Sequence, residues 1–145
     1  MTVREYMTLS PVCIGPTNTL AQAHELMRNR NVRHLPVLER DRLVGIVSQR
    51  DLHLIETLKS TDPELVTVDE AMTESPYAVP PDSRVEAVVG TLISNKYGSA
   101  VVVEEDVVVG IFTRSDALRA LLGLLDGRAS QEAETDVPEE SPAPP

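Results

Sequence analysis

The chain has 145 residues, of which 41% are hydrophobic but only 3% aromatic, so its core must be built from aliphatic side chains. The net charge of −10 argues against a general nucleic-acid partner, and no apolar run of roughly eighteen residues is present to span a membrane. The N-terminal sequence lacks the apolar region of a signal peptide, and the single cysteine, Cys13, has no partner for a disulfide or a zinc site. These features favour a cytoplasmic location.

Charge is distributed unevenly along the sequence. Residues 1–60 carry eight Lys or Arg against six Asp or Glu, residues 61–125 carry four against eleven, and residues 126–145 carry one against six. The basic region therefore lies in the first half, within residues 28–34.

An internal repeat organises the sequence. A shift of 65 positions aligns residues 3–52 with residues 68–117 without a gap, and fourteen of the fifty pairs are identical. The matched landmarks include the motifs MTxSP and VGI, each present once in both copies. We infer a duplication, and therefore two units related by a pseudo-two-fold axis.

Each copy predicts the same succession of elements. A short helix or turn opens the copy, a brief apolar strand follows the SP pair, and short polar residues then form a turn and N-cap. An amphipathic helix, two strands joined by a charged tight turn, and a closing helix complete the copy. In the first copy the predictions are a strand at Val12–Ile14, an N-cap turn at 16–19, a helix containing Leu20 to Met27, strands at Leu35–Leu38 and Leu43–Val47, and a helix at Asp51–Lys59. In the second copy they are a strand at Tyr77–Val79, an N-cap turn at 81–83, a helix containing Val85 to Leu92, strands at Ala100–Val103 and Val107–Phe112, and a helix from Asp116 to about Leu125.

These elements give a first repeat at residues 1–59, a linker at 60–67 and a second repeat at 68–125. Neither repeat has the roughly 100 residues that would bury its apolar faces alone, so we expect both sheets to pack into one module. Residues 126–145 are rich in Pro, Glu and Ser, with too few apolar side chains to offset the entropy of ordering. We therefore expect a disordered acidic tail.

The sharpest motif recurs in both copies, as GIVSQRD at 45–51 and GIFTRSD at 110–116. In each, a strand ends in a hydroxyl residue, and an Asp follows three positions later at the start of a helix. Free N–H groups at such a helix start suit phosphate or hydroxyl ligands, and a carboxylate can accept two hydrogen bonds from a ribose diol. The same residues could equally form two ordinary capping boxes, in which hydroxyl and Asp satisfy the first backbone N–H groups.

These motifs, with the stretches NVRHLPVLERDRLVGIVSQRD and KYGSAVVVEEDVVVGIFTRSD, resemble the CBS domain, named after cystathionine β-synthase. Residues 1–125 are similar to a pair of CBS domains, or Bateman module. The resemblance implies an α+β fold of tandem β-α-β-β-α repeats, packed through their sheets with pseudo-two-fold symmetry. It also implies a non-catalytic regulatory homodimer with no catalytic cofactor, which holds AMP, ADP, ATP or S-adenosylmethionine in clefts between the repeats.

The same resemblance assigns roles to particular residues. The hydroxyl and acidic positions would bind phosphate and ribose, the first strands would line the adenine pocket, and the residues entering the second strand would complete each cleft with nearby cations. In the first copy these residues are Val12, Cys13, Ile14, Arg33, His34, Leu35, Pro36, Ser48, Arg50 and Asp51. In the second copy they are Tyr77, Ala78, Val79, Ser99, Ala100, Val101, Thr113, Arg114 and Asp116.

The two copies differ in their cations. The first has Arg33, His34 and Arg50, whereas Arg114 is the only cation near the motif of the second, so we expect two clefts of unequal strength. Alternatively, the arginines within residues 28–33 could simply complement the dipole at a helix end.

The sequence disfavours catalysis and leaves one other function open. Ser48, Asp51 and a histidine could be imagined as a catalytic triad, but no nucleophile elbow, phosphate-binding loop or metal-ligand spacing accompanies them. An interaction protein with empty clefts, docking on an enzyme or transporter, is the main alternative.

The leucines within residues 118–125 make the last helix apolar over more than one face, which favours a dimer surface.

Overall fold

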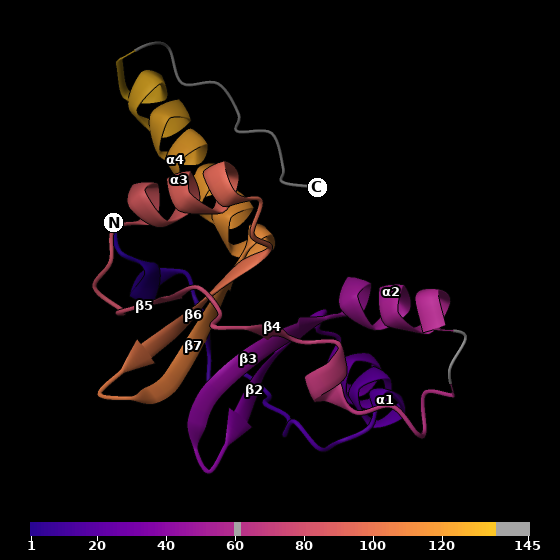
Figure 1. Cartoon of the computed structure of the whole chain (residues 1–145). Coiled ribbons are helices and arrows are strands. Elements are labelled where there is room, and N and C mark those ends of the chain that lie inside the picture. Colours follow the sequence, from indigo (N-terminus) through magenta and orange to yellow (C-terminus); the bar gives the residue numbers. More distant parts are fainter. Residues whose placement is uncertain (60–61, 136–145) are drawn as a thin grey trace.

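The computed structural model describes residues 1–59 and 62–135. The chain forms two halves, each with a sheet and two helices (Figure 1). One sheet has the order β2 (His34–Glu39), β3 (Arg42–Ser48), β4 (Thr73–Glu74). The other has the order β1 (Thr8–Leu9), β7 (Val107–Thr113), β6 (Ser99–Glu104), β5 (Ala78–Val79). The helices are α1 (Leu20–Arg30), α2 (Gln49–Lys59), α3 (Val85–Asn95) and α4 (Arg114–Thr135).

The opening segment of each repeat crosses to the other half. Strand β1 pairs with β7 of the second repeat, and β4 pairs with β3 of the first. Backbone bonds repeat the exchange symmetrically, because Val3 N–H donates to Ser83 at 2.9 Å and Val68 N–H donates to Asn18 at 2.8 Å. The predicted repeat limits therefore differ from the spatial units, since periodicity reveals which segments are alike but not which half each packs against.

Two glycines permit this crossing. A Cβ at Gly45 would lie 2.6 Å from Met72 Sδ and 2.9 Å from the Thr73 carbonyl. A Cβ at Gly110 would lie 2.5 Å from Met7 Sδ and 3.0 Å from the Thr8 carbonyl. A Cβ at either position would force the crossing segment to shift, so the VGI motif carries glycine because a crossing strand lies directly against it.

Each half has its own aliphatic core. In the first, helices α1 and α2 cover buried residues such as Leu20, Leu35 and Val47, and Val68 of the crossing segment joins them. In the second, Val88, Ala100 and Phe112 are joined by Val3 and Met7. The two sheets then meet along β3 and β7. Completion of each core by the other repeat makes the two copies one module.

Local residues define the helix ends. Thr19 accepts a hydrogen bond from the Gln22 backbone and forms the predicted cap of α1, but α3 begins after Arg84, whose side chain makes no cap. The predicted cap at 81–83 was therefore placed too early. Helices α1 and α3 both end at a left-handed residue, Asn31 and Lys96.

Two predicted elements differ from the structure. The strand at Val12–Ile14 is reduced to a single parallel bridge between Ile14 and Val37. Helix α4 continues to Thr135 and projects beyond the second half, so disorder from residue 126 was wrong for the first ten residues (Figure 1). The sequence there contains strong helix formers such as Ala, Gln and Glu, which propagate a helix that is already nucleated. Residues 60–61 of the linker and 136–145 of the tail lie outside the described residues.

Candidate functional site

A cavity of about 740 Å³ lies between the two halves. The motif of the first repeat forms one wall, and residues that open the second repeat form the other, because β4 pairs with β3 and carries the following residues across the gap. We call this cavity the interrepeat cleft. It is lined by Arg33, His34, Ile46, Ser48, Gln49, Arg50, Asp51, His53, Thr73, Glu74, Ser75, Pro76, Tyr77, Lys96, Tyr97, Gly98, Ser99 and Arg114.

Ser48 and Asp51 form a capping box at the edge of this cleft. The Ser48 N–H donates to Asp51 Oδ2 at 2.9 Å, and the Asp51 N–H donates to Ser48 Oγ at 3.1 Å. The capping interpretation is therefore correct for the first repeat. Asp51 is half-buried, and among residues 1–59 and 62–135 no side chain donates a hydrogen bond to its Oδ1. That oxygen remains available to a ligand hydroxyl.

His34, at the start of β2, lines the cleft close to Gly98 of the second half. A Cβ at Gly98 would lie 2.9 Å from His34 Nε2, so glycine makes room for the imidazole. Burial lowers the pKa of His34, and nearby Arg114 and Arg33 lower it further, while the Asp51 carboxylate acts in the opposite direction. The imidazole is therefore largely neutral near neutral pH.

Two tyrosines and a group of cations complete the lining. The rings of Tyr77 and Tyr97 lie 5.6 Å apart at 33°, which gives the second repeat's wall an aromatic surface. The lining carries four permanent cations against two carboxylates, so an anion is favoured near the cations. The cations are Arg33, Arg50, Lys96 and Arg114, and the carboxylates are Asp51 and Glu74.

The matching motif of the second repeat has a different environment. Asp116 is fully buried and does not line the interrepeat cleft. Its Oδ2 accepts hydrogen bonds from the Thr113 N–H at 2.8 Å and the Thr113 hydroxyl at 3.1 Å, and its Oδ1 pairs with Arg119. Leu54 occupies the position that corresponds to Arg119 in the first repeat. The two aspartates thus share a motif but differ in their access to a ligand.

Comparison with known families agrees with this architecture. The model of the CBS domain matches residues 3–54 and 68–123, which is most of the chain. The chain belongs to the CBS domain family. Its two CBS repeats follow the duplicated segments found in the sequence, and the predicted mixed helix and strand fold is confirmed.

Individual CBS proteins resemble the chain over most of its length. A putative acetoin utilization protein from Vibrio cholerae is 32% identical, with a TM-score of 0.78 over 90% of this chain and 96% of that one. The structure of CBSX2 in complex with AMP is 29% identical, with a TM-score of 0.71 over 86% of this chain and 98% of that one. Hypoxic response protein 1 of Mycobacterium tuberculosis is 28% identical over 83% of this chain and 85% of its own length.

The structure brings together eight of the residues predicted for the two CBS clefts. All eight line the single interrepeat cleft: Arg33, His34, Ser48, Arg50, Asp51, Tyr77, Ser99 and Arg114. Sequence reasoning missed Lys96 and Tyr97, which follow α3 and reach the cleft because Lys96 turns the chain in a left-handed conformation. The available signal was a cation and an aromatic residue directly after a helix that has no Gly at its C-terminal cap position.

The other predicted residues lie elsewhere. Leu35 lies in the first core, and Val79 and Ala100 lie in the second. Pro36 and Val101 follow Leu35 and Ala100 along their strands and are buried on the opposite face of each sheet. Ala78 is exposed outside the cleft lining, and Val12 packs on the first core. Thr113 and Asp116 form the closed motif already described.

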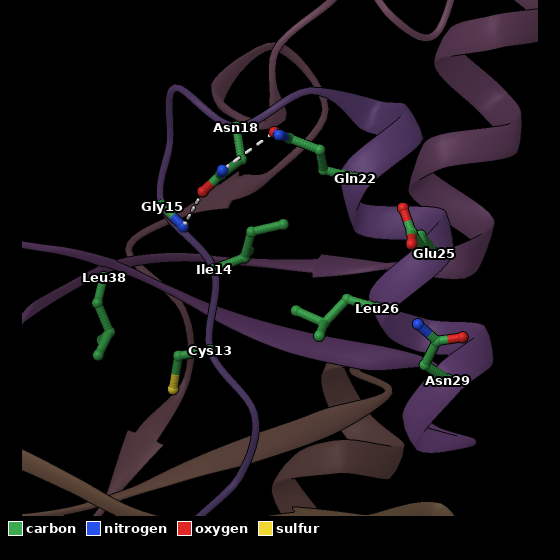
Figure 2. A pocket seen from close by; sticks show the side chains of 9 residues that line it. All are labelled: Cys13, Ile14, Gly15, Asn18, Gln22, Glu25, Leu26, Asn29 and Leu38. Carbon is green, nitrogen blue, oxygen red and sulfur yellow. Dashed lines mark hydrogen bonds between the residues drawn. The ribbon is translucent and has the colours of Figure 1, made fainter.

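Cys13 and Ile14 line a different depression, of about 550 Å³, between α1 and the outer edge of β2 (Figure 2). The Ile14 N–H donates to Pro36 and the Leu38 N–H donates to Ile14, so this segment follows the β2 edge and not the β4 edge that faces the cleft. Burial raises the pKa of the Cys13 thiol, which keeps it protonated and unreactive. These residues are therefore poorly placed to hold a ligand beside Asp51.

Proposed function

We propose that the chain is a non-catalytic regulatory module that binds an adenosine compound in the interrepeat cleft. The observation that carries this proposal is the convergence of Asp51, an aromatic wall and several cations around one cavity of about 740 Å³. Those three features match the three parts of such a ligand, which are a ribose diol, a flat base and a phosphate or other charged group. The relative CBSX2, at 29% identity, has a structure in complex with AMP, which supports the same class of ligand.

In the proposed complex, Asp51 accepts hydrogen bonds from the ribose hydroxyls while its other oxygen keeps the helix cap. Tyr77 offers its ring face to the adenine, and the arginines bind the phosphate. His34 stands among these arginines, where a phosphate would favour its protonated form. In this proposal the neighbouring groups serve to bind and orient the ligand.

The proposal assigns one ligand to each chain. Asp116 is buried and already accepts from Thr113 and Arg119, so a ribose there must first displace an ion pair. A ligand in the interrepeat cleft needs no such displacement, because Asp51 is partly exposed and has an oxygen to spare. The unequal clefts expected from the sequence thus become one open site and one occluded motif.

We further propose that two chains associate through the outer faces of α2 and α4. Seven leucines there are 48–71% exposed, which is more apolar surface than a single helix pair normally leaves in water: Leu54, Leu58, Leu118, Leu121, Leu122, Leu124 and Leu125. A second copy presents the same leucine face, and a two-fold axis would bring the two faces together. No described helix is both long and apolar enough to cross a membrane. We also propose that the protein acts in the cytoplasm and regulates a partner protein.

Isothermal titration of ligand-free protein with AMP, ADP, ATP and S-adenosylmethionine tests the function. The expected result is saturable binding of at least one of them, weakened about tenfold to a hundredfold in Asp51→Ala, because a hydrogen bond to a charged group is lost. Glu86→Gln is the control, since it changes an exposed carboxylate on α3 outside the cleft. An absence of binding at millimolar concentrations contradicts the proposal and favours the alternative of an interaction protein with empty clefts.

A further inference from the structure

A second cavity, of about 480 Å³, adjoins the interrepeat cleft on the side of the first repeat. It lies where the end of α1 meets the start of α2, and we call it the side pocket. Arg33, Gln49 and His53 line both cavities, so the two share a wall. A ligand that fills the cleft can therefore extend past Arg33 into the side pocket.

The lining of the side pocket is suited to an anion. Arg28 and Arg33 contribute two permanent positive charges, and no Asp or Glu is among the lining residues. His24 and His53 also line it, with ring centroids 5.3 Å apart. Glu56, which is not among the lining residues, is engaged by His24, with 2.6 Å between Glu56 Oε1 and His24 Nε2. The pocket thus offers two guanidinium groups with little acidic competition.

We propose that the side pocket holds the terminal phosphates of an adenosine di- or triphosphate whose nucleoside occupies the interrepeat cleft. This inference rests on the proposed function and specifies its substrate class. Arg33 stands at the junction and contacts the phosphate nearest the ribose, while Arg28 contacts the phosphates beyond it. The chain then discriminates among adenine nucleotides by the length of the phosphate tail.

A plainer role exists for Arg28, since cations in the last turn of a helix complement its dipole. A substitution of Arg30 serves as the control that distinguishes these two roles of Arg28. Arg30 lies in the same last turn of α1 and is also exposed, but it does not line the side pocket. Arg28→Gln and Arg30→Gln therefore remove the same charge from the same helix end, and only the first removes it from the pocket.

The test is isothermal titration of the wild type, Arg28→Gln and Arg30→Gln with AMP, ADP, ATP and tripolyphosphate, in chelator-containing buffer. We expect ATP to bind the wild type about tenfold more tightly than AMP, since charge-assisted contacts are added. Arg28→Gln should reduce that ratio several-fold, and Arg30→Gln should preserve it. Unfolding curves of both variants should be measured first, to establish that the fold is intact before affinities are compared.

The outcomes separate this inference from the proposed function. If AMP binds but ATP binds no more tightly, or if both variants lower the ratio equally, the side pocket does not hold phosphates and the cleft assignment stands. If tripolyphosphate alone binds as tightly as ATP, the pocket is a polyanion site independent of the nucleoside, and the inference is overturned. If no adenosine compound binds at all, the proposed function fails.

Discussion

The duplicated aspartates should contribute very differently to stability. Asp116→Ala removes a fully buried carboxylate that accepts two hydrogen bonds from Thr113 and pairs with Arg119. A broken buried ion pair costs about 3–5 kcal/mol when the remaining charge stays buried. Arg119 is 65% exposed and can return to water, so we expect about 2–4 kcal/mol for this variant. Asp51→Ala removes a partly exposed cap residue, which costs about 1 kcal/mol.

Urea and thermal unfolding followed by circular dichroism measure this difference. For a chain of this length a loss of 1 kcal/mol lowers the melting temperature by roughly 3–5 °C, so Asp116→Ala should melt several degrees below Asp51→Ala. Arg119→Leu, which recreates the arrangement at Leu54, keeps the Thr113 bonds but leaves the fully buried Asp116 carboxylate without its cation, so it should also lower the free energy of unfolding. Equal losses for the two aspartate variants would refute the claim that Asp116 is a structural group.

Three further predictions follow from the same structure. Gly110→Ala and Gly45→Ala should each lower the free energy of unfolding by about 1–3 kcal/mol, because the new Cβ collides with Met7 or Met72. Gly90→Ala on α3 is the control, since its Cβ meets no atom within 4 Å and the substitution should stabilise the protein by about 0.5–1 kcal/mol. Denaturant titration measures these differences, and an unchanged stability in Gly110→Ala would contradict the crossing geometry. The lowered pKa of His34 means that the folded state resists protonation, so the stability present above about pH 6.5 should fall as the pH drops toward the folded pKa. His34→Asn should reduce this dependence of the unfolding free energy on pH, as measured in unfolding curves from about pH 7.5 to 5. An unchanged dependence would argue against a buried neutral imidazole. Leu121→Glu combined with Leu125→Glu should convert a dimer into a monomer, as measured by light scattering after gel filtration, while the control Ile93→Glu on α3 should remain dimeric. A wild-type protein that is already monomeric would contradict the proposed interface.

Much of the fold could be predicted from the sequence because the repeat supplies the same pattern twice. Short, nearly continuous apolar runs joined by charged turns identify β2, β3, β6 and β7, and Thr19 marks the start of α1 through its cap. The crossing of the opening segments could not be predicted, since a period of 65 residues is the same whether a segment packs on its own repeat or on the other.

The site could be predicted only in part, for a related reason. The motif predicts a capping box in both repeats, and the structure has a hydroxyl and an aspartate in contact in each. What separates the open Asp51 from the occluded Asp116 is a residue outside the motif, Arg119, one turn further along the helix. Likewise, Val12 and Tyr77 hold equivalent positions and each packs against a core, but Tyr77 also lines the interrepeat cleft, where it meets Tyr97.

The most direct test of the account is the stoichiometry of AMP binding to the ligand-free protein, measured by isothermal titration on wild type, Asp51→Ala and Asp116→Ala at a temperature where all three are folded. The account predicts one AMP for each chain in the wild type, strong weakening in Asp51→Ala, and retained affinity in Asp116→Ala. Two AMP molecules for each chain, or binding that depends on Asp116 and not on Asp51, would contradict it.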